Sequence, residues 1–141
     1  MAKIICIANQ KGGVGKTTTA VNLGASLAVA EKRTLLVDMD PQGNAGSGVG
    51  VEKETLRENV YHALINDVEP RSVVKKTILP YLDILPATDD LAGAELELVT
   101  LPERERRLSR VLGALEDSYQ YILIDCPPSL GLLTLNAMVA A

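Results

Sequence analysis

Residues 4–19 read IICIANQKGGVGKTTT, and this stretch decides the fold. Its first five residues form an apolar run rich in β-branched side chains, which is typical of a strand buried on both faces in a parallel sheet. A glycine-rich segment follows, and apolar residues then recur at helical spacing from Thr17 to Ala30. A strand, a glycine-rich loop and a helix in this order are the context that a phosphate-binding loop requires.

The chemistry of this loop suits the triphosphate of a nucleotide. Gly12, Gly13 and Gly15 lack a Cβ atom, so the backbone can curl and point successive N–H groups at phosphate oxygens. The start of the following helix adds its dipole. Lys16 can neutralise the β- and γ-phosphates, and the Thr17 hydroxyl can ligate Mg²⁺. The predicted nucleotide contacts are Lys11, Gly12, Gly13, Val14, Gly15, Lys16, Thr17 and Thr18.

Two further apolar runs end in carboxylates. Residues 34–40 end with Asp38 and Asp40, and residues 121–125 end with Asp125. The carboxyl ends of parallel strands lie at the same edge of a sheet as the phosphate loop. We therefore expect these three acids to converge on one magnesium–nucleotide complex.

The remaining sequence alternates strands with helices. Apolar periodicity predicts a strand over 81–85, and the region 41–50 reads as a loop because it is rich in glycine. Helices are predicted within 56–64, 89–99, 102–116 and from 132 onward. This pattern indicates an α/β fold, a P-loop NTPase with a doubly wound, mostly parallel sheet and flanking helices.

The last ten residues read as the beginning of a helix, and a doubly wound sheet with so few strands leaves an open hydrophobic edge. We therefore expect residues 1–141 to be the N-terminal part of a single P-loop ATPase domain that is truncated at its C-terminus.

Composition narrows the class of protein. Lys and Arg number 14 against 18 Asp and Glu, so the net charge of −4 gives no basic footprint for nucleic acid over the chain as a whole. No apolar run approaches the roughly 18 residues of a membrane span, and no signal-peptide pattern opens the chain, so we expect a cytoplasmic protein. The two cysteines, Cys6 and Cys126, are interpreted as small buried hydrophobes, and their spacing matches no zinc pattern.

Three motifs in order resemble a known family. Residues 9–18, NQKGGVGKTT, resemble the deviant Walker A motif of the ParA/MinD superfamily, in which Gln10 and the additional Lys11 depart from the standard loop. Residues 38–45, DMDPQGNA, are similar to that family's first switch, and residues 125–129, DCPPS, to its Walker B motif and second switch. The resemblance spans essentially the whole chain and is closest to chromosomal ParA/Soj partitioning ATPases.

The resemblance implies roles for individual residues. Lys11 would reach across a nucleotide-sandwich dimer to the partner's ATP, and Asp40 would orient or deprotonate the attacking water. Lys11, Lys16 and Asp40 would thus be the catalytic residues. Mg²⁺ would be held by Thr17, Asp40 and Asp125, the last of these through water, and Asp38 would support the switch. Asn9, Gln42 and Asn44 are candidate polar supports around the phosphates.

The resemblance also implies a cycle. ATP would close a homodimer that binds DNA nonspecifically on the nucleoid, and a ParB-like partner would stimulate slow ATP hydrolysis to drive chromosome or plasmid segregation. A MinD-like membrane-cycling ATPase that regulates division placement is the second reading of these motifs, although we expect neither membrane binding nor a metal cluster. Iron–sulfur reductases of the nitrogenase iron-protein type share the same loop, and a truncated chain could also bind nucleotide without turnover.

Overall fold

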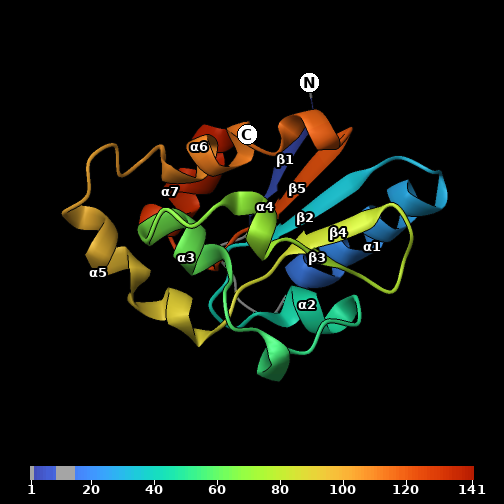
Figure 1. Cartoon of the computed structure of the whole chain (residues 1–141), viewed down its shortest axis with the longest axis horizontal. Coiled ribbons are helices and arrows are strands. Elements are labelled where there is room, and N and C mark those ends of the chain that lie inside the picture. The colour runs from blue at the N-terminus through green and yellow to red at the C-terminus, as the bar shows by residue number, and fades with distance from the viewer. Residues whose placement is uncertain (1, 9–14) are drawn as a thin grey trace.

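The computed structural model describes residues 2–8 and 15–141, and they form a five-stranded sheet with helices on both faces (Figure 1). The strand order is β1-β5-β2-β4-β3, in which the first four strands run parallel and β3 pairs antiparallel with β4. The predicted mostly parallel sheet is therefore confirmed. The strands are β1 (Lys3–Ile7), β2 (Thr34–Asp38), β3 (Lys75–Lys76), β4 (Leu82–Leu85) and β5 (Tyr121–Asp125).

Helices flank the sheet as the sequence predicts. The α-helices are α1 (Lys16–Val29), α2 (Asn44–Gly48), α3 (Val60–Ile65), α4 (Pro70–Val73), α5 (Ala94–Val99), α6 (Arg107–Gly113) and α7 (Leu132–Ala140). Single 3₁₀ turns cover Lys53–Thr55, Asp89–Gly93 and Glu116–Ser118. No helix in the described part of the chain is long and apolar enough to cross a bilayer.

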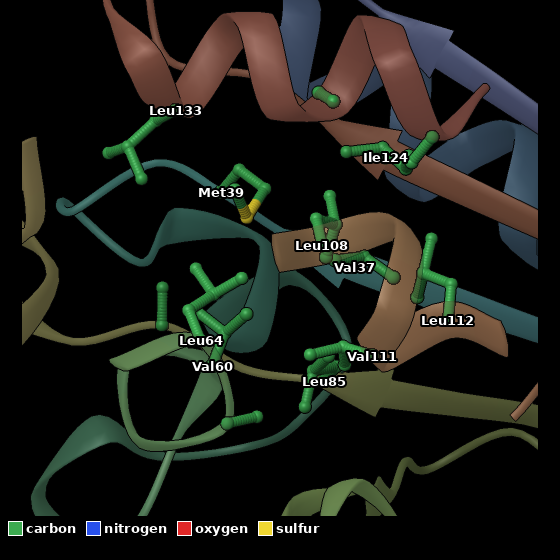
Figure 2. Packing of buried hydrophobic residues seen from close by; sticks show 14 of the residues in the cluster. Val37, Met39, Val60, Leu64, Leu85, Leu108, Val111, Leu112, Ile124 and Leu133 are labelled. Carbon is green, nitrogen blue, oxygen red and sulfur yellow. The ribbon is translucent and has the colours of Figure 1, made fainter. Parts of the chain in front are cut away.

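Alternation along the strands builds two cores. In β2, Leu35 and Val37 face one side of the sheet, where they pack with residues of α3, α5, α6 and α7, whereas Leu36 faces the other side with residues of α1 and α2. Figure 2 shows the larger core, in which Val37 and Ile124 from adjacent strands lie among side chains of α3, α6 and α7. Since every side chain of β2 is buried, this central strand is sandwiched on both faces.

Small residues bring α1 close to the sheet. Its buried face consists of Ala20, Gly24 and Ala28 together with Lys16, and a Cβ atom at Gly24 would already lie 3.4 Å from Leu82. The predicted helix is confirmed within one residue at each end, but Leu23, one of the apolar residues that recur at helical spacing, is exposed.

Several predicted boundaries were wrong. The region 41–50, interpreted as a loop, contains α2, and residues 102–106 form turns ahead of α6 in place of its predicted first turn at Pro102. The helix expected within 56–64 begins at Val60 because Asn59 caps it, accepting a hydrogen bond from the backbone N–H of Tyr61. The predicted helix over 89–99 is a 3₁₀ turn followed by α5.

The mixed charges of residues 103–107 suggest a solvated face. Glu103, Arg104 and Arg106 are exposed as expected. Arg107, in contrast, is only 5% exposed, and its Nε donates to the carbonyl oxygen of Leu64 over 2.9 Å. Its Nη2 lies 3.0 Å from Asp67 Oδ1. Arg107 therefore ties α6 to the end of α3.

Replacing Arg107 with alanine should lower the free energy of unfolding by about 2 kcal/mol, because a buried carbonyl loses a charged donor and the side-chain stem no longer fills its site. Urea denaturation followed by circular dichroism measures the change. The matched control is Arg110→Ala in the same helix, whose side chain is 59% exposed and lies 3.8 Å from Glu103; it should change stability by less than about 0.5 kcal/mol. Equal losses in the two variants would contradict this role for Arg107.

Candidate functional site

The carboxyl ends of β1, β2 and β5 meet at the N-terminus of α1. Gly15 precedes the helix with a left-handed backbone at φ 82°, and its carbonyl accepts the hydrogen bond of the Thr19 N–H at 2.8 Å. A side chain at this φ is disfavoured, so glycine is the residue that allows the chain to enter α1 here. The helix begins with Lys16 and Thr17, which places both side chains beside the ends of the strands.

Lys16, Thr17 and Asp125 form a connected cluster at this edge. The Lys16 ammonium, on a residue only 8% exposed, pairs with Asp125 Oδ1, and the Thr17 hydroxyl donates to Asp125 Oδ2 at 2.9 Å. Lys16 Nζ also lies 3.9 Å from Asp40 Oδ2. Residues separated by more than 100 positions in the sequence are thus brought together by the parallel pairing of β5 with β1 and β2.

Asp38 is opposite Asp125 in the β2–β5 register, and both acids are fully buried, whereas the side chain of Asp40 is 15% exposed. Asp38 Oδ1 accepts from the Asp40 N–H at 3.0 Å, whereas Asp38 Oδ2 has no hydrogen-bond partner among the described residues. Burial raises the pKa of Asp38 to about 8, and the Asp125 carboxylate adds to this effect. Asp38 is therefore largely protonated at neutral pH, and this limits the negative charge at the strand ends.

This burial predicts a pH dependence. Because the pKa of Asp38 is about 8 in the folded chain against 3.8 for the ordinary group, the folded state binds the proton more tightly. Its contribution to stability is thus complete below pH 3.8 and is lost as the pH rises through about 8.

Asp38→Asn, which is neutral at every pH, should flatten the stability curve over this interval and exceed the native chain at the alkaline end by more than about 1 kcal/mol. Urea denaturation across the pH range, without nucleotide or magnesium, measures it. Parallel curves for the two proteins would rule out the buried proton.

A cavity of about 670 Å³ opens beside the cluster. This volume is within the usual range for small-ligand sites. The predicted residues Thr18, Gln42 and Asn44 line it together with Gly15, Lys16, Thr17 and Asp40. The same wall includes Pro128, which follows β5, and Asn22 and Val21 of α1.

The loop after β2 is fixed against the end of β4. Gly43 has φ 66°, and a Cβ atom there would lie 2.5 Å from the carbonyl oxygen of Ala87. Lys53 Nζ donates to the Gln42 carbonyl at 2.6 Å, and Asp40 Oδ1 accepts from the Gln42 N–H at 3.0 Å. These contacts position Asp40 with its other oxygen toward Lys16.

A second cavity, of about 640 Å³, lies at the opposite end of the sheet, where the strands begin. Arg33, Arg71, Tyr81 and Tyr119 line it. It is of similar size and is lined by a lysine–acid pair, Lys76 with Asp83, but this lysine side chain is 88% exposed, and no helix N-terminus after a glycine turn lies there in the described part of the chain. The chemistry expected of a phosphate site is therefore found only at the first cavity among the described residues.

The two cysteines contact each other, and the sequence did not predict this contact. Cys6 Sγ in β1 and Cys126 Sγ just beyond β5 lie 2.8 Å apart. Cys126 is buried, as expected, but Cys6 is partly exposed. Their thiol–thiol hydrogen bond lowers the pKa of Cys6 and raises that of Cys126. A spacing of 120 positions gives no signal of this contact, which depends on strand order alone.

Several predicted residues lie outside the part of the chain that the structure describes. These are the nucleotide contacts Lys11, Gly12, Gly13 and Val14 and the polar support Asn9. Their roles stay predictions. Of the predicted contacts that are described, Gly15, Lys16, Thr17 and Thr18 all line the first cavity.

Comparison with known proteins gives one family. A family model described as an AAA domain matches residues 2–141. The chain is 61% identical over 141 residues to the chromosome partitioning protein ParA of Myxococcus xanthus, of which it covers 50%. It is 59% identical to the sporulation initiation inhibitor protein Soj of Bacillus subtilis, of which it covers 56%. In both comparisons the whole of the chain is aligned, so it spans about half the length of these relatives.

Solved structures share the fold. A cobyrinic acid a,c-diamide synthase from Mycobacterium smegmatis, solved with a bound ATP analog and magnesium, is 44% identical and superposes with a TM-score of 0.96. The match covers 100% of this chain and 57% of that one. The P-loop NTPase fold predicted from the sequence is therefore confirmed.

Proposed function

The chain belongs to the AAA domain family matched over residues 2–141, and we propose that it carries the Mg-ATP site of a ParA/Soj-type partitioning ATPase. The observation that supports this most is the cluster of Lys16, Thr17 and Asp125 beside a cavity of about 670 Å³. Residues 1–141 would be the N-terminal part of a single P-loop ATPase domain. A lysine and a hydroxyl at the start of a helix, facing an acid at a strand end, are what phosphate and Mg²⁺ require.

The residues present fit magnesium. Thr17, Asp40 and Asp125 offer hard oxygen donors, and Mg²⁺ commonly takes one or two carboxylates and completes its shell with water and substrate phosphates. When bound, Mg²⁺ would neutralise charge on the β- and γ-phosphates.

Different groups of the protein would bind the phosphates of ATP and activate the attacking water. The Lys16 ammonium, now paired with Asp125, would turn to the β- and γ-phosphate oxygens, and the N–H groups at the start of α1 would donate to the same phosphates. Asp40 would orient the attacking water or accept its proton. By family resemblance, Lys11 would reach the ATP of a second subunit, so hydrolysis would depend on an ATP-dependent homodimer.

The relatives support a proposal for the cellular role. We propose that the dimer binds DNA nonspecifically on the nucleoid and that a ParB-like protein stimulates slow hydrolysis, which drives segregation of a chromosome or plasmid. Identities of 61% to ParA and 59% to Soj favour this role over a MinD-like membrane cycle.

Thr17→Val tests the magnesium-dependent part of the site. The substitution keeps the β-branched shape and removes the hydroxyl that contacts Asp125. The variant should lose most of the magnesium-dependent gain in ATP affinity, about tenfold or more, while its affinity without magnesium changes little. Equilibrium binding of a fluorescent ATP analog with magnesium or with a chelator measures both values.

Thr19→Val is the matched control, because Thr19 is exposed two residues further along α1 and does not line the cavity. It should bind the analog as the native chain does. An unchanged response to magnesium in Thr17→Val would remove Thr17 from the proposed metal site.

A further inference from the structure

Cys6 and Cys126 form a thiol pair next to the end of β5, where Asp125 lies. Cys6 lies opposite Ile124 in the β1–β5 register, and Cys126 follows two positions later, so the two side chains are diagonal neighbours on one face of the sheet. The backbone N–H of Cys126 donates to the Ile7 carbonyl at 3.1 Å, which continues the strand pairing past Asp125. The sequence contains only these two cysteines.

We propose that Cys6 and Cys126 form a reversible intramolecular disulfide, which makes this pair an oxidation site of the chain. The Sγ atoms are 2.8 Å apart, so closure to a bond of about 2.05 Å requires a movement of less than about 1 Å. Hydrogen bonds between β1 and β5 already fix the backbones that carry them. Bond formation therefore requires only a short movement of the sulfur atoms.

Glutathione disulfide can serve as the oxidant that converts the two thiols to a disulfide. The Cys6 sulfur, the more exposed of the two, attacks one sulfur of glutathione disulfide and displaces one glutathione as a thiol. The Cys126 sulfur then attacks Cys6 in this mixed disulfide and releases the second glutathione. The two cysteine protons pass to the two departing thiolates, and two electrons move from the protein thiols to the oxidant.

The disulfide between Cys6 and Cys126 would affect the proposed ATP site because the bond lies next to this site. Cys126 lies directly between Asp125, which contacts Lys16 and Thr17, and Pro127. Cys6 is in the strand that leads into residues 9–14. The disulfide would tie the start of the 125–129 segment to β1 and restrain its movement. If the proposed function is correct, oxidation would slow ATP turnover; the disulfide itself is tested without reference to ATP.

The test is equilibration of the folded chain with glutathione disulfide at a fixed concentration of reduced glutathione, followed by acid quenching and mass spectrometry. The native chain should lose two hydrogen atoms, carry no glutathione, and remain monomeric on a non-reducing gel. Reduction should restore both thiols. Cys126→Ala should instead accumulate glutathione on Cys6.

The native pair should be half-oxidised at a glutathione disulfide concentration at least about tenfold below that which half-modifies Cys6 in Cys126→Ala, because the second thiol is already in place. If Cys126→Ala, a substitution at a buried position, does not fold, Cys6→Ala serves as the single-cysteine variant instead, because Cys6 is partly exposed. Glutathione adducts or intermolecular dimers as the main products of the native chain would overturn the proposal. If the reduced protein showed no ATPase activity, that result would contradict the proposed function and not the proposed disulfide.

Discussion

Replacing Lys16 with alanine is expected to weaken binding of Mg-ATP by about 100-fold or more. The Lys16 ammonium is almost fully buried and faces the cavity, so no neighbouring cation among the described residues can take its place beside the phosphates. Its loss also leaves the buried Asp125 carboxylate with Thr17 as its remaining side-chain donor among the described residues. Isothermal titration calorimetry with ATP and magnesium measures the affinity, and a thermal melt establishes that the variant is folded.

Lys76→Ala is the control for this experiment. Its side chain is 88% exposed and lies 3.5 Å from Asp83 at the other end of the sheet. The control should bind Mg-ATP with the native affinity. A folded Lys16→Ala chain that binds ATP as the native chain does would contradict the proposed site at its first step.

Asp40→Asn is expected to lower the rate of ATP hydrolysis by about 10²–10⁴-fold while leaving ATP affinity within a few-fold of native. Asparagine keeps the oxygen that accepts from the Gln42 N–H, so the loop after β2 can retain its shape. It cannot accept a proton from water. Phosphate release under single-turnover conditions measures the rate, and titration calorimetry measures the affinity.

Asp117→Asn, at an exposed position ahead of β5, serves as the control and should hydrolyse ATP at the native rate. If Asp40→Asn turned over as fast as this control, Asp40 would not be the group that acts on water. If Asp40→Asn bound ATP more weakly but hydrolysed it at the native rate, Asp40 would act in magnesium binding alone.

The sheet and the core of the site could be predicted because local patterns and topology agree there. Continuous apolar runs require strands buried on both faces, and parallel strands bring their carboxyl ends to one edge. Asp125, Lys16 and Thr17 therefore meet as the motifs predict. The contact also requires β5 to lie beside β1 and β2. The βαβ pattern leaves only a few possible strand orders.

Other features depend on contacts that the sequence pattern does not show. Residues 44–48 contain two glycines and an asparagine, yet they form α2 because they pack against α1, where a Cβ at Gly48 would lie 3.1 Å from Val21. Arg107 reads as a surface residue, but the carbonyl of Leu64 gives it a buried partner. The contact of Cys6 with Cys126 likewise arises only once β5 is placed beside β1.

A crystal structure of this chain with magnesium and a non-hydrolysable ATP analog tests the central claim most directly. We predict the β- and γ-phosphates at Lys16 and the start of α1, with Mg²⁺ on the Thr17 hydroxyl and Asp125 released from its pairing with Lys16. Nucleotide bound in the second cavity, beside Arg33 and Arg71, with the contact between Lys16 and Asp125 intact, would contradict the proposed site.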